Sequence, residues 1–135
     1  MRGAVAGALA ATLWAAAEPA LGRAFGTTFS DVRLLGRAVT RGRLWPAVGL
    51  VVHVANGAVF GWTFERVGAR GIRQGVLAAE VENLVLWPGM ALVDRFHPDR
   101  RDGTWPRLVT SPHAFAYEAT THGLFGALLG ALVRD

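Results

Sequence analysis

The sequence predicts an all-α integral membrane protein, a four-helix bundle that forms a single transmembrane domain over residues 1–135. Three observations support this: 52% of the residues are hydrophobic, the apolar residues gather in four long segments, and the arginines lie between those segments. A helix needs about 20 apolar residues to cross the hydrocarbon core of a bilayer. The predicted spans cover about residues 3–25, 44–64, 74–94 and 112–133.

The first span, residues 3–25, carries no charge before Glu18, and Pro19 predicts a kink in its second half. An early arginine, the apolar run and the alanines at 15–17 also imitate a cleavable secretory signal peptide, but we expect a retained helix. Apolar residues and arginines then alternate at helical spacing over residues 29–41. This pattern predicts a short amphipathic helix at the membrane interface.

Caps at both ends support that short helix, with Ser30 or Thr28 at its start and Gly42 at its end. The second span, residues 44–64, offers His53, Asn56 and Thr63 as its polar groups. A soluble helix would show a charged outer face, and none can be drawn on this segment.

The third span, residues 74–94, carries Glu80 and Glu82 within an otherwise apolar stretch. The fourth, residues 112–133, carries Glu118 besides its histidines. Between them, residues 97–111 contain prolines, a glycine and charged groups, which predicts a structured polar loop. Its His97-Pro98-Asp99 run can bind a cation or a headgroup phosphate, or its acids can simply pair with arginines.

The basic residues predict the orientation of the bundle. All 14 are arginines, and the formal net charge is +4. Nine lie in the first and third loops and five in the second loop and the termini, and positive charge marks the cytoplasmic side. We therefore expect a protein of the inner cell membrane with both termini outside. The arginines read as lipid headgroup contacts rather than as a nucleic-acid surface, and the absence of cysteine excludes thiolate chemistry.

An internal repeat relates the two halves of the chain at offsets of 69 and 68 residues. His53-x3-Gly57-x3-Gly61 recurs as His122-x3-Gly126-x3-Gly130, and Gly7-x-Leu9-Ala10-Ala11 recurs as Gly75-x-Leu77-Ala78-Ala79. The pattern predicts two repeated helical hairpins related by an axis along the membrane normal. Such an axis would bring His53 and His122 to equivalent depths.

Ionisable groups occur within every predicted span. A charged residue at a helix centre costs about 2.5 to 3.5 kcal/mol even on translocon scales, so these groups are expected to face the bundle interior. On the third span Glu80 and Glu82 point about 160° apart at 100° per residue. We place Glu80 and Asn83 inward, because their face is the more polar, and Glu82 on a flank.

The predicted site therefore combines Glu118, His122, His53, Glu80 and Glu18. Carboxylates and imidazoles together can act as acid and base on a lipophilic substrate, in an isomerase, cyclase or hydrolase. Glu118, His122 and His53 can instead hold a divalent metal, and His53 with His122 can hold a haem.

Other functions use the same residues without catalysis. The polar groups can fix helix register in an accessory or structural subunit, or form a proton or ion path, which would require an oligomer. Expected partners are the lipid bilayer, a lipophilic small molecule, and further copies of the chain or a larger membrane complex, with no nucleic acid. The sequence does not select one reaction.

Overall fold

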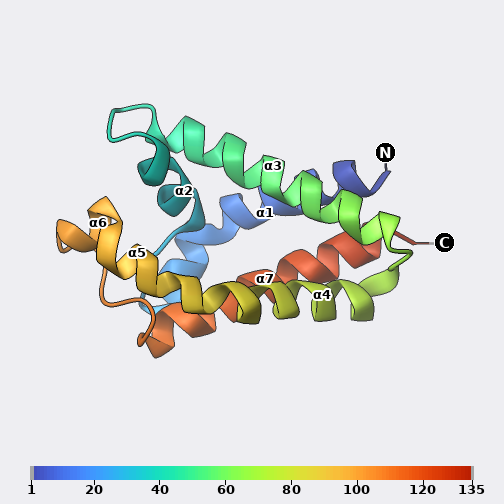
Figure 1. Cartoon of the computed structure of the whole chain (residues 1–135). Helices are drawn as coiled ribbons and strands as arrows, with labels where there is room; N and C mark the ends of the chain where they lie inside the picture. Colours follow the sequence, from blue (N-terminus) through green and yellow to red (C-terminus); the bar gives the residue numbers. More distant parts are fainter. Residues whose placement is uncertain (1, 135) are drawn as a thin grey trace.

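The computed structural model describes residues 2–134 as an all-α protein built from two pairs of long antiparallel helices (Figure 1). Helix α1 (Arg2–Phe25) packs along α3 (Trp45–Arg66), and α4 (Gly71–Leu86) packs along α7 (Pro112–Leu132). The two pairs are joined mainly where α1 contacts α7.

Short helices close one end of the molecule, where the two pairs diverge (Figure 1). They are α2 (Asp31–Val39), α5 (Met90–Phe96) and α6 (Pro98–Arg101). The 3-10 turn η1 (Trp87–Gly89) links α4 to α5 at Pro88, whose ring removes a backbone donor and clashes with the preceding turn of an α-helix. The predicted third span is thus a helical segment over Gly71–Phe96 that a 3-10 turn interrupts at Pro88.

Glycines bring the paired helices into backbone contact. Between α1 and α3, Gly7 lies so close to the backbone of Gly57 and Gly61 that an added side chain would overlap it. Between α4 and α7, Gly75 lies equally close to Gly126 and Gly130. Small residues that let two backbones approach are the usual contact in membrane helix pairs, where no hydrophobic effect drives helices together.

The two pairs make these contacts at positions that the sequence repeat relates. Gly7 corresponds to Gly75, and the two glycines of each histidine motif occupy the same place in the second contact. The structure adds another correspondence, because Gly3 contacts Gly61 as Gly71 contacts Gly130. The contact pattern supports the repeat, and superposition of the hairpins about a membrane-normal axis stays a prediction.

Three of the four predicted spans are confirmed as long and apolar enough to cross a membrane: Arg2–Phe25, Trp45–Arg66 and Gly71–Phe96. The fourth predicted span is a helix of the expected length, α7 with 21 residues, but it is not among the helices apolar enough to count as candidate spans, so its crossing of the membrane stays a prediction. Its polar residues lower its apolarity. Tyr117, Glu118, Thr121 and His122 are buried against the other helices, so α7 hides its polar groups instead of exposing an all-apolar surface.

The amphipathic helix is present, but its apolar side packs on protein. Ser30 caps it as predicted, accepting a hydrogen bond from the Arg33 amide, whereas its end is capped at Thr40 and not at Gly42. Gly36 of α2 and Gly49 of α3 are in backbone contact. Helix α2 is therefore a wedge held against α3.

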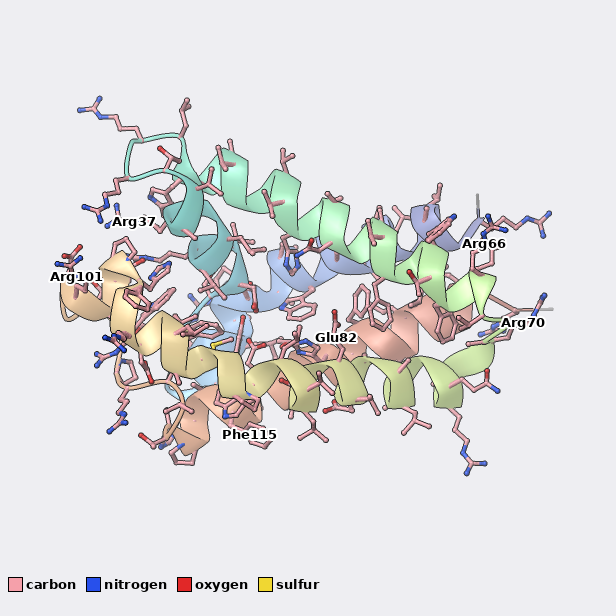
Figure 2. The ribbon with its side chains drawn as sticks, in the orientation of Figure 1. Arg37, Arg66, Arg70, Glu82, Arg101 and Phe115 are labelled. Atoms are coloured by element: carbon pink, nitrogen blue, oxygen red, sulfur yellow. The ribbon has the colours of Figure 1, made fainter. Side chains whose placement is uncertain are left out.

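The predicted loops lie at opposite ends of the helix pairs. Figure 2 shows Arg37 and Arg101 at the end closed by the short helices, and Arg66 and Arg70 at the other end. Arg2 and Arg134 line one hollow with Arg70, so both ends of the described chain lie beside the second loop.

Candidate functional site

Glu18 caps the wedge helix from outside it. Its Oε1 accepts hydrogen bonds from the backbone amides of Asp31 (2.9 Å) and Val32 (3.3 Å), and its Oε2 accepts one from the Ser30 hydroxyl. These are free amides of the first turn of α2, where the helix dipole favours a negative charge. Glu18 thus fixes the start of α2 against the inner side of α1.

Asp31 and Glu118 place two further carboxyl groups behind that cap. Both side chains are buried, and they lie close enough to interact through a side-chain hydrogen bond. Burial, and then the negative charge of Glu18, raises the pKa of Asp31 to about 7. Asp31 Oδ2 and Glu118 Oε1 have no well-oriented donor within residues 2–134. A proton held between the two carboxyl groups would satisfy both oxygens.

The two repeat-related histidines meet at one indole ring. The His53 and His122 rings lie 4.9 and 4.7 Å from the Trp14 ring, centre to centre, in edge contacts. His122 Nδ1 lies 2.9 Å from the Glu118 carbonyl oxygen. Because a carbonyl only accepts, we assign a proton to Nδ1, which leaves Nε2 free to accept one, 4.0 Å from Glu82 Oε2. Helix pairing therefore brings both imidazoles to the centre.

These groups surround a cavity of about 120 Å³ between the helix pairs, beneath α2. Figure 2 shows Glu82 pointing from α4 into the space between the pairs. At roughly 30 Å³ per molecule the cavity has room for about four waters or one small polar group. Its polar lining consists of Asp31, His53, Asn56, Glu82 and His122, and its apolar lining includes Trp14, Phe60 and Phe125.

The structure brings together most of the residues singled out from the sequence. Glu18, His53, Glu118 and His122 are all buried in the interior. On the third span Asn83 is buried as predicted, but Glu82 and not Glu80 lines the cavity, while Glu80 lies beside Gly123 of α7.

The physical reason for that error lies in the small residues of α4. Gly75, Ala79 and Asn83 form its buried face. At 100° per residue, Glu82 lies about 60° from Ala79 and Glu80 about 100° away on the other side. If the face of small residues is taken as the inward face of the third span, as in the other spans, Glu82 is the acid nearer the interior.

Asp31 and Tyr117 belong to the cluster and were missed. Asp31 follows the helix-capping Ser30, where an acidic residue ordinarily interacts with the helix dipole at the surface. Its burial follows from where α2 packs, which no local pattern in the sequence reveals. Tyr117 is fully buried, with its hydroxyl near the Glu18 carboxylate. It lies one residue before Glu118 on the same helix. The one signal that could have found it is the helical periodicity that places residue 117 on a buried face.

The predicted metal and haem sites do not fit this arrangement. Within residues 2–134, no three His, Asp or Glu side chains are placed to hold a metal ion, so Glu118, His122 and His53 do not form the predicted metal site. Pockets that hold cofactor-sized ligands measure roughly 300 to 1,000 Å³. The cavity beside the histidines, at about 120 Å³, is too small for a haem.

The polar loop after α5 contains Asp–Arg pairs. Asp99 is fully buried and accepts a hydrogen bond of 2.6 Å from Arg33 of α2, and Arg37 Nε lies 3.6 Å from its second oxygen. His97 lies 3.1 Å from the Leu34 carbonyl and stacks on Trp105. Burial lowers the pKa of His97, which favours its neutral form. The loop thus anchors the wedge helix and positions the site.

Comparison of the chain with protein-family models, with curated proteins and with solved structures finds no match. The geometry of the site is therefore the basis for the function proposed below.

Proposed function

We propose that this chain is a polytopic membrane protein that uses its buried carboxylate and histidine cluster as an acid–base site for the polar end of a lipophilic molecule. The observation that carries the proposal is a cavity lined by titratable side chains from four helices, with Glu118 directly behind it. Groups that serve only to hold helices together normally satisfy one another's hydrogen bonds. Here His53 Nε2, on a side chain that lines the cavity, has no hydrogen-bond partner within the described chain.

The residues divide naturally into an acid and a base. The Asp31–Glu118 pair is the proton donor, because two buried carboxyl groups side by side share one proton and keep a single negative charge. His122 accepts a proton at Nε2, since its Nδ1 is committed to a backbone carbonyl. An acid and a base beside one small cavity suit isomerisation, cyclisation or hydrolysis, all of which require proton transfer in both directions.

The proposed membrane arrangement has four traverses in the inner cell membrane and both termini outside. Three helices have the length and composition of membrane spans. Helix α7, which packs against α4 and α1 and buries its polar groups, completes the proposed bundle. The larger share of arginines lies beside α2, α5 and α6, and we place that end on the cytoplasmic side.

A structural role is the second candidate, favoured by Glu18. Its carboxylate makes three hydrogen bonds to the start of α2, so this acid is explained by holding the wedge helix. The same explanation does not extend to Glu118, whose Oε1 lacks a donor in residues 2–134. An accessory subunit would therefore use Glu18, and an enzyme would use Glu118.

Two substitutions separate these roles. Glu118→Gln is nearly isosteric but cannot ionise, and His122→Ala removes the base. Cells producing each variant at equal membrane abundance are compared by mass spectrometry of total lipids with cells producing the wild type, and the melting temperature of each purified variant is measured. The proposal expects both variants to lose the lipid change that the wild type causes while melting within a few degrees of it.

The matched control is Asp102→Asn, a change in an acid at the exposed end of the molecule, 61% exposed. It should preserve the wild-type lipid profile. If the wild type changes no lipid, or if loss of stability fully explains the loss of the effect in both variants, the acid–base function is wrong and the structural role stands.

A further inference from the structure

We infer that the molecule bound at this site is a lipophilic amine, with its apolar chain in a groove between α1 and α7 and its cationic head in the central cavity. The inference rests on the proposed function of the cluster and adds the chemical class of the ligand. Three features lead to it: the groove, the charge of the cavity and the size of the cavity.

The groove lies at the seam between the helix pairs and has a volume of about 270 Å³. Leu13 of α1 and Leu124 of α7 are about half exposed at its rim, on the side that would face lipid. Thr121 is the one hydroxyl-bearing residue in a lining that is otherwise hydrocarbon and aromatic. An apolar chain entering from the bilayer would fit this surface, and a charged or sugar-like group would not.

Two aromatic side chains are shared by the groove and the cavity. Trp14 and Phe125 line both spaces, and their rings lie 5.9 Å apart. A ligand with its chain in the groove and its head in the cavity would have to pass beside these two rings. Aromatic faces next to a binding space also attract cations, at a separation of up to about 6 Å from the ring centre.

The charge of the cavity selects the head group. Asp31 and Glu82 line it, and the described lining contains no arginine or lysine. Arg33 and Arg37 of α2, the helix that carries Asp31, are directed to Asp99 and Asp102 instead. A phosphate or carboxylate head would meet carboxylates with no counter-charge, whereas an ammonium head would supply the missing partner.

His53 provides a second and independent indication of a ligand. The residue is 6% exposed, lines the cavity, and its Nε2 atom has no hydrogen-bond partner in residues 2–134. An imidazole nitrogen in this position accepts a hydrogen bond from an N–H group. The cavity, at about 120 Å³, has room for a primary or methylated amine.

The experiment compares three single-chain probes of equal chain length, dodecylamine, dodecanol and dodecanoate. Each is titrated into the purified full-length protein in a non-ionic detergent, and binding is followed by calorimetry and by the shift in melting temperature. We expect the amine to bind at least tenfold more tightly than the alcohol and the carboxylate not to bind. A tenfold difference corresponds to about 1.4 kcal/mol.

Variants show where the amine binds. Asp31→Asn removes a cavity charge and should weaken amine binding about tenfold, and Ala17→Leu fills the groove and should weaken the amine and the alcohol alike. Asp102→Asn, the matched change outside the cavity, should leave the affinity unchanged. This control also measures any partition of the amine into micelles.

The two proposals fail in different ways. Tighter binding of the alcohol or carboxylate that still depends on Asp31 and Ala17 would overturn the amine and leave the site in place. Probe binding that is indifferent to both substitutions would remove the ligand site altogether. If instead the amine binds as expected while Glu118→Gln and His122→Ala leave the lipid profile of cells unchanged, the acid–base function is wrong.

Discussion

Gly57→Ala tests the close pairing of α1 and α3 directly. A Cβ atom added at Gly57 would lie 2.5 Å from Ala11 Cβ and 2.7 Å from the Gly7 carbonyl oxygen. Non-bonded carbon atoms sit at about 3.5 to 4.0 Å, so the two helices must separate by about 1 Å. Neither obstacle can rotate away, because one is backbone and the other is attached directly to it.

The expected cost is that of overpacking a well-packed contact, about 1 to 3 kcal/mol in the free energy of unfolding. The better helix propensity of alanine offsets little of this, because membrane helices remain helical when they come apart. Removing the Ala11 methyl group should recover part of the loss. The double variant Ala11→Gly, Gly57→Ala should therefore be more stable than the sum of the two single changes predicts, by about 1 kcal/mol.

The free energy of unfolding is measured by reversible titration with a denaturing detergent in lipid–detergent mixtures. Gly89→Ala serves as the control, because nothing lies within 4 Å of a Cβ at Gly89 and its φ of −62° suits any residue. This variant should stay within about 0.5 kcal/mol of the wild type. If Gly57→Ala costs no more than Gly89→Ala, the two helices do not pack as described.

Three further predictions concern charges and orientation. Asp99→Asn leaves the guanidinium of Arg33 without its buried anion and should cost about 1 to 3 kcal/mol in the same titration, and an unchanged stability would contradict the anchoring of α2. Because the folded-state pKa of Asp31 is raised from 3.8 to about 7, the folded protein binds more protons than the unfolded chain between those values, so stability should fall as the pH rises through this window. Asp31→Asn should flatten that dependence, and a wild type that gains stability over the same range would show that the sign is wrong. Reporter enzymes that require export should be active when fused to either terminus, and cytoplasmic activity at both ends would reverse the orientation.

Much of the fold could be predicted because its signals are local. Apolar runs of about 20 residues, a proline after a run, and a serine before an amphipathic stretch each act within a few turns of helix. These signals located the long helices and the cap at Ser30, whereas the 3-10 turn at Pro88 was not predicted. The glycines spaced four apart next to His53 and His122 were equally informative, because their backbone contacts recur in both pairs.

The position of α2 could not be predicted from its pattern of hydrophobic residues. An amphipathic helix buries the same apolar stripe whether it lies on lipid or on another helix, since both surfaces are apolar. What distinguishes the two is a small residue at the point of closest approach. Gly36 in the middle of the stretch, facing Gly49 of the next helix, is that residue, and the burial of Asp31 follows from it.

The candidate site arises where the two halves of the repeat differ. At the offsets of the repeat, Glu18 corresponds to Leu86, Trp14 to Glu82, and Gly49 to Glu118. The glycine contacts and the paired histidines are common to both halves, so they belong to the scaffold and bring two imidazoles to one place.

At each of these paired positions only one half of the repeat carries an acid, and this asymmetry has a physical consequence. Two symmetric copies of a buried carboxylate would repel each other across the axis, whereas a single acid facing glycine or leucine leaves room for α2 on one side and a cavity on the other. The wedge helix fills the first of these spaces through Asp31 and its cap at Glu18. The second space is the cavity. It remains open to a ligand, and for that reason we propose that the function lies there.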